Sequence, residues 1–244
     1  MEKFTVFIGF ITCFSTFAQH QLVSNREITR PESNATKAKP IINLSILPLF
    51  GEITKTETQK ASDNRFLQEC DRNFSSREDA SKFFAERAWE YLSEGEQDTA
   101  IYRFNLAYLL NPKNVDSYWG LGVASYQQGR YDESARLLHR GLVLDPNNAT
   151  LMVDVATVQI NCFKEKRNCE DIDGALGLLR KAVTLDSTNA NTFLKLSVAE
   201  FHNEHFEEAW NNLHRCYELD PAMLDFDFVK ELIAKKEDPK GIFK

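Results

Sequence analysis

Residues 115–148 decide the fold, and they read VDSYWGLGVASYQQGRYDESARLLHRGLVLDPNN. Gln128-Gly129 marks a turn between two helices, and Asp145-Pro146 ends the second one because proline cannot continue a helix. An Asn-Pro pair stands 34 residues earlier at Asn111-Pro112, and an Asp-Pro pair recurs at Asp220-Pro221. A spacing of 34 residues predicts a repeated pair of helices.

Four windows align on this spacing: residues 81–114, 115–148, 149–189 and 190–223, the third with seven extra residues. Three columns of the alignment hold small residues only: Ala88, Gly122, Ala156 and Ser197; Ala100, Ser134, Ala175 and Ala209; Ala107, Gly141, Ala182 and Cys216. Two antiparallel helices approach closely only where the facing side chains are small. Each window is therefore predicted to be a tightly packed helical hairpin.

The segments YWGLG (118–122), YQQGRY (126–131) and LDPNN (144–148) are close to the consensus of the tetratricopeptide repeat family, which the chain resembles over residues 81–223. The resemblance implies an all-α fold, a right-handed solenoid of four helical hairpins. Arg87 and Ser187 depart from the consensus, which has Leu and Pro at these positions. A solenoid needs capping elements at its ends. Amphipathic segments at about 55–72 and 225–236 are predicted to be capping helices of a domain spanning residues 53–244.

The N-terminal residues are predicted to be a secretory signal. Residues 1–18 have one early Lys, an apolar run too short to span a membrane, and small residues before a cleavage after Ala18. An uncleaved membrane anchor and a lipid attached to Cys13 are the alternatives. The sequence thus favours a periplasmic or secreted mature protein without a membrane span.

Residues 19–52 are predicted to be a disordered linker that ends in an apolar segment, residues 41–51. Pro48 and Gly51 argue against a helix there, so an extended conformation is expected. An apolar segment beside a disordered linker needs a surface on which to bury its side chains. It either docks on the protein itself, where it would close the groove described next, or forms a clip for another protein.

In the family, the first helix of each repeat lines a concave groove that holds peptides. The matching positions form an aromatic and aliphatic wall and comprise Trp89, Leu92, Trp119, Val123, Tyr126, Val153, Ile160, Leu194, Val198 and Phe201. Aromatic anchors are typical of binding hot spots. The carboxylate clamp of some relatives is absent, because its positions hold Ala85, Glu86, Trp89, Asp154 and Lys195. The alternative is that the wall residues only pack between repeats.

The cysteines indicate one disulfide and no metal site. Cys162 and Cys169 bracket the insertion of the third repeat and are expected to bond in an oxidising compartment. Cys70 and Cys216 are expected to be buried thiols. The spacing of His202, His205 and His214 with Cys216 matches no zinc-binding pattern.

Composition narrows the function classes. The net charge of −7 argues against nucleic acid and anionic membrane surfaces as partners. No phosphate-binding glycine loop, catalytic triad or paired carboxylates stand out, so neither an enzyme nor a cofactor is predicted. The leading hypothesis is an exported scaffold that binds a protein or peptide in its groove. The alternative is a structural subunit of an envelope assembly, its groove closed by the N-terminal segment.

Overall fold

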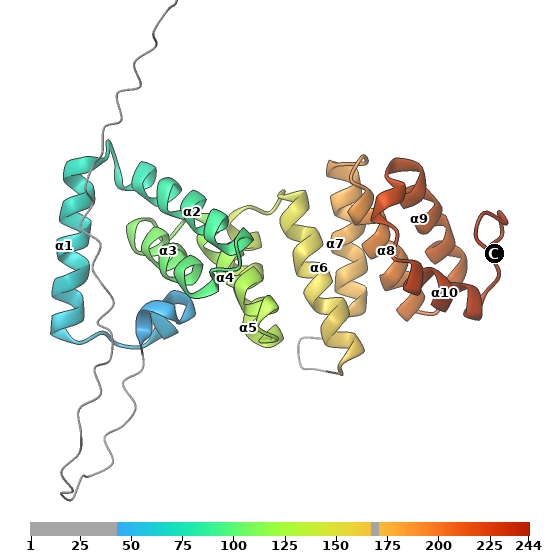
Figure 1. Cartoon of the computed structure of the whole chain (residues 1–244), viewed down its shortest axis with the longest axis horizontal. Helices are drawn as coiled ribbons and strands as arrows, with labels where there is room; N and C mark the ends of the chain where they lie inside the picture. Colours follow the sequence, from blue (N-terminus) through green and yellow to red (C-terminus); the bar gives the residue numbers. More distant parts are fainter. Residues whose placement is uncertain (1–42, 167–170) are drawn as a thin grey trace, which may run out of the picture. The chain divides into compact units, whose positions relative to one another are not determined.

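The computed structural model describes residues 43–166 and 171–244, which form ten α-helices, three short 3₁₀ helices and no strand (Figure 1). The all-α fold predicted from the sequence is confirmed. The α-helices are α1 (Glu57–Asn73), α2 (Arg77–Ser93), α3 (Gln97–Leu110), α4 (Val115–Gln127), α5 (Tyr131–Leu144), α6 (Ala149–Lys164), α7 (Ile172–Leu185), α8 (Ala190–His202), α9 (Phe206–Leu219) and α10 (Phe226–Lys235). The 3₁₀ helices are η1 (Leu44–Ile46), η2 (Pro48–Glu52) and η3 (Pro221–Met223).

The helices pack as four successive hairpins, α2 with α3, α4 with α5, α6 with α7 and α8 with α9. The second helix of each hairpin also packs on the first helix of the next one, and neighbouring first helices contact each other. The molecule therefore has a face made of first helices (α2, α4, α6, α8) and a face made of second helices (α3, α5, α7, α9).

Small residues set the distance between paired helices, as the alignment predicted. All twelve members of the three small-residue columns are buried. A β-carbon added at Gly122 would lie 2.6 Å from the Leu138 side chain, and one added at Gly120 would lie 2.0 Å from the Phe104 ring. Any larger residue at these positions would have to push the helices apart.

The turns inside the first, second and fourth hairpins each contain a residue in the left-handed conformation. Gly95 and Gly129 supply it in the first two hairpins, with φ of 82° and 72°. In the fourth hairpin the same turn is made by Glu204, whose φ is 61°. Glycine adopts this conformation without steric cost, whereas a residue with a β-carbon does not.

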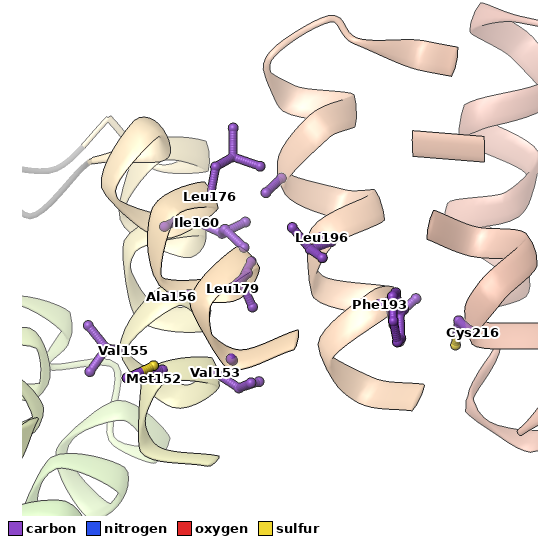
Figure 2. Packing of buried hydrophobic residues seen from close by; sticks show 14 of the residues in the cluster. Met152, Val153, Val155, Ala156, Ile160, Leu176, Leu179, Phe193, Leu196 and Cys216 are labelled. Carbon is purple, nitrogen blue, oxygen red and sulfur yellow. The ribbon is translucent and has the colours of Figure 1, made fainter. Parts of the chain in front are cut away.

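The largest apolar cluster joins the third and fourth hairpins to α10. Figure 2 shows Ile160 of α6 with Leu176 and Leu179 of α7, and Leu196 of α8 opposite them. At the other end, α1 is held more lightly, because Cys70 is its one buried residue. Among residues 43–166 and 171–244, no helix is long and apolar enough to cross a membrane.

Residues 43–53, here called the N-terminal clip, lie against α3 and also contact α4 (Figure 1). Instead of the expected extended conformation, they form the two short turns η1 and η2. Pro48 begins η2, and Leu49 and Phe50 take left-handed backbone angles there, with φ of 52° and 56°. Their side chains are buried, with exposed fractions of 3% and 9%.

Candidate functional site

The ten predicted groove residues come from the four first helices and differ in exposure. Leu92, Val153, Ile160 and Leu194 are buried, with at most 8% of their surface exposed, and so act in packing between helices. The other six are half-buried and form the accessible part of the wall: Trp89, Trp119, Val123, Tyr126, Val198 and Phe201.

Two tryptophans form the centre of this wall. The rings of Trp89 on α2 and Trp119 on α4 meet edge to face, with centroids 5.5 Å apart. Trp89 also meets the ring of Phe104 at 5.1 Å, which ties the pair to the core of the first hairpin. Ring contacts on both sides limit the rotation of Trp89, so its position is set before any ligand arrives.

Carboxylates from the next first helix orient both indoles. Trp89 Nε1 donates a hydrogen bond to Asp116 Oδ1 (3.1 Å), and Trp119 Nε1 donates one to Asp154 Oδ2 (2.6 Å). Because each bond spans two repeats, the distance between repeats and the orientation of the rings are coupled. The spacing of the groove positions predicts a wall with few charges and does not reveal that these carboxylates are the partners of the indoles.

Asp154 and Lys195 place partly desolvated charges beside the aromatic wall. Burial raises the pKa of Asp154, although the hydrogen bond from Trp119 and the charge of Lys195 oppose this. Burial also lowers the pKa of Lys195, while Asp154 and Asp225 raise it. Asp154 on α6 and Lys195 on α8 therefore attract each other, and opposite charges in a low-dielectric setting attract more strongly than on the surface.

Near the C-terminal end of the first-helix face lies a cavity of about 190 Å³ between α6, α8 and α10. Ile160, Val198 and Phe228 give it an apolar side, and Lys195 and His202 lie on its polar side. Burial and the charge of Lys164 lower the pKa of His202, so its neutral form is favoured. Asn161, also at this cavity, donates to Tyr126 Oη (2.7 Å) and thereby fixes that hydroxyl.

The N-terminal clip does not close the groove. Its polar partners lie on second helices, where Asn105 of α3 holds the Ser45 and Leu47 carbonyls and two arginines of α5 hold Glu52. The hypothesis that this segment occupies the groove is therefore wrong for residues 43–53. The reason is chemical: the polar groups of the clip find partners in Asn105, Arg136 and Arg140, whereas the indole N–H groups of the first-helix face are already bonded to carboxylates.

The cysteines are only partly described. Cys162 is fully buried near the C-terminal end of α6, but Cys169 and Cys13 lie outside the described residues, so the Cys162–Cys169 disulfide stays a prediction. Cys70 and Cys216 are buried thiols as expected, and burial raises the pKa of both. Within residues 43–166 and 171–244 no group of three His, Cys, Asp or Glu side chains is placed to hold a metal ion.

Comparison with known proteins identifies the repeat. Two family models match, one described as "TPR repeat" over residues 90–129 and one as "Tetratricopeptide repeat" over residues 115–148. A small glutamine-rich tetratricopeptide repeat-containing protein of Mycosarcoma maydis is 26% identical over 118 residues, which cover 45% of this chain and 34% of that protein. Superkiller protein 3 of Schizosaccharomyces pombe is 22% identical over 120 residues, covering 49% of this chain and 9% of that protein. The chain thus spans about a third or less of the length of these relatives.

Solved structures show the same fold at low identity. They include MamA from Desulfovibrio magneticus (TM-score 0.54, 17% identity, 66% of this chain and 87% of that one) and pilF of Pseudomonas aeruginosa (0.55, 17%, 66% and 70%). A third is YrrB, described as a TPR protein with an unusual peptide-binding site (0.51, 21%, 65% and 78%). Residues 90–148 are therefore tetratricopeptide repeat sequence, and the four stacked hairpins have the fold of tetratricopeptide repeat proteins.

Proposed function

We propose that the chain is a non-enzymatic binding scaffold whose first-helix face takes a peptide or protein segment. The observation that carries the proposal is the Trp89–Trp119 pair, whose rings are half-buried and whose N–H groups are bonded to Asp116 and Asp154. Rigid aromatic anchors contribute most to binding when they are already oriented in the free protein.

The chemistry of the wall favours an apolar ligand. Trp119, Val123 and Tyr126 follow one another along α4, and Val198 and Phe201 continue the apolar character on α8. A surface of this kind suits the apolar side of an amphipathic helix or an extended apolar peptide. The peptide-binding site described for YrrB, a TPR protein of similar fold, agrees with this proposal.

The proposal includes export to the cell envelope or exterior, on the strength of the leader-like residues 1–18. N-terminal sequencing of the protein from its native source tests this point. A mature chain that begins at Gln19 supports export, and a chain that retains residues 1–18 contradicts cleavage.

The binding test compares three proteins. They are the wild type, a groove variant that carries both Trp119→Ala and Phe201→Ala, and a matched control, Phe83→Ala. Phe83 lies on α2 with 45% of its surface exposed and outside the predicted groove, so the control removes an aromatic ring without touching the wall. Affinity capture from native extract, followed by crosslinking of the retained protein, reports both the partner and its contact site. Helicity by circular dichroism must be equal in all variants.

We expect the control to retain the partner, the groove variant to lose it, and the crosslinks to fall on α4 and α8. Equal capture by all variants with crosslinks on second helices would refute the proposal. That result would favour the structural-subunit hypothesis, for which the exposed Val143 on α5 (68%) and Leu185 on α7 (46%) offer an outer apolar surface.

A further inference from the structure

The N-terminal clip is held to the helices by tertiary contacts of the kind that a protein makes with a bound peptide. Asn105 is completely buried, and its Nδ2 donates to the backbone carbonyls of Ser45 and Leu47, both at 2.8 Å. An amide side chain that holds two consecutive turns of a segment by their main chain recognises a conformation rather than particular side chains. The Asn105 contact with Ser45 bridges 60 positions of sequence, so it is tertiary and not part of a local turn.

Two arginines recognise one acidic residue of the clip. The Glu52 carboxylate lies 2.5 Å from Arg136 Nη1, and its other oxygen pairs with Arg140. Burial tends to raise the pKa of Glu52, but the hydrogen bonds and charges of the two arginines hold it below its ordinary value. The receiving surface thus selects an anionic group beside the apolar site that takes Leu49 and Phe50.

The fit between clip and surface is incomplete. The Oδ1 atom of the same buried Asn105 has no hydrogen-bond partner among the described residues. Leaving a buried acceptor unpaired is unfavourable, and a segment that presents an N–H group there would bind better. The site is therefore not filled to its full hydrogen-bonding capacity by residues 43–53.

The clip is also held in an unfavourable backbone conformation. Leu49, Phe50 and Glu52 have φ of 52°, 56° and 53°, in the left-handed region that favours glycine, and Gly51 between them has φ of 71°. Three L-residues in this region persist only because the surface beneath them over-determines their conformation. A ligand that reaches the same contacts with a relaxed backbone would have an advantage over the clip.

From these observations we propose that the surface formed by Asn105, Arg136 and Arg140 is a second peptide-binding site, occupied by the clip and open to displacement by an acidic, apolar segment of another protein. The charge complementarity with two arginines and the apolar site for two adjacent side chains define that partner. The polar contacts of this site lie on the second helices α3 and α5, whereas the aromatic wall lies on the first helices, and Leu49 reaches the apolar cluster on which Trp89 also packs.

The test uses a fluorescent synthetic peptide, NLSILPLFGEIT, which copies residues 43–54. The affinity of this peptide is measured by fluorescence anisotropy for the full wild-type chain and for a clip variant that carries both Leu49→Ala and Phe50→Ala. These substitutions weaken the clip without altering the receiving surface. The clip variant is expected to bind the peptide at least tenfold more tightly. Adding Arg136→Ala and Arg140→Ala should remove this gain, as should a peptide with Gln in place of Glu. Trp119→Ala should leave it unchanged.

Equal binding by the wild type and the clip variant, or binding that ignores the arginines, would overturn the proposal. Hydrogen exchange of the wild-type chain keeps the test decisive even if the clip variant unfolds. The amides of Leu47 and Phe50, which bond within the clip, should exchange faster than those in the middle of α3 and α5. Exchange of all these amides in one cooperative step would show that the clip opens only with the whole domain and would refute displacement.

Discussion

Replacing Glu204 by glycine should stabilise the fourth hairpin. Glu204 occupies the turn position that Gly95 and Gly129 fill in the first two hairpins, and its φ of 61° lies in the left-handed region. Its side chain is exposed and makes no hydrogen bond or ion pair in the described structure, so the substitution removes no contact. The effect therefore arises from the backbone.

The magnitude follows from two opposing terms. A residue with a β-carbon costs about 1–2 kcal/mol in the left-handed region. Glycine loses more conformational entropy on folding than other residues, and this loss offsets about 0.5–1 kcal/mol of the stabilisation. The net stabilisation is about 0.5–1 kcal/mol, which corresponds to about 1–4 °C in Tm for a chain of this size.

Urea and thermal unfolding followed by circular dichroism measure the change, with hydrogen exchange in α8 and α9 to locate it. Glu204→Ala is the control, because it removes the charge but keeps the β-carbon, and it should be nearly neutral. The reciprocal change Gly129→Ala should destabilise by a similar amount, since a β-carbon at Gly129 meets no atom within 4 Å and feels only the backbone. If Glu204→Ala stabilises as much as Glu204→Gly, charge and not backbone conformation sets the effect, and the reasoning fails.

Three further predictions concern packing, acid sensitivity and the disulfide. Gly120→Ala should destabilise by about 1–3 kcal/mol in urea unfolding because its methyl group would collide with Phe104, whereas Gly177→Ala, which meets nothing within 4 Å, should not destabilise. Backbone N–H groups of the C-terminal segment and His214 lower the pKa of Asp238 despite its burial. The stabilisation from Asp238 is therefore present above the pKa of an unfolded Asp and is lost as the pH falls through the lower folded value. The indole N–H signal of Trp210, which donates to the Lys236 carbonyl, should report this loss in acid by NMR, and Asp238→Asn should abolish the pH dependence. Denaturing alkylation of residues 19–244 without reductant should label two of the four cysteines if Cys162 and Cys169 are bonded; labelling of all four would contradict the bond.

The repeat could be predicted from the sequence because its physical cause is local and recurrent. Small residues such as Gly122 and Ala156 stand at a fixed interval, and close helix packing is the one arrangement that requires them there. The Gln128-Gly129 turn was predictable for the same reason. The alignment also predicts a turn in the fourth window, but not that Glu204 adopts the left-handed conformation there, because the sequence lacks the glycine.

The binding face could be predicted only in part. Helical spacing placed Trp89 and Trp119 on the first-helix face, but it could not show that Asp116 and Asp154 bond to them, because those bonds depend on the offset between successive hairpins. Likewise, Leu194 has groove spacing and yet is buried, because the spacing does not say how closely the next helix approaches.

The clip was the least predictable element, and its position bears on how the two proposed sites relate. Pro48 and Gly51 argue correctly against an α-helix, but four successive left-handed residues are rare enough that no local rule selects them. The contacts that impose this turn come from Asn105, far along the chain. Both ends of the described chain meet second helices: the clip lies on α3, and Phe243 stacks on Trp210 of α9 at 6.0 Å. The indoles of the first-helix face are oriented by hydrogen bonds between repeats that do not involve either end. Leu49 of the clip, however, belongs to the apolar cluster on which Trp89 packs. Displacing the clip should therefore leave the two indole hydrogen bonds in place but loosen the apolar support of Trp89, so that the two proposed sites are coupled through this cluster.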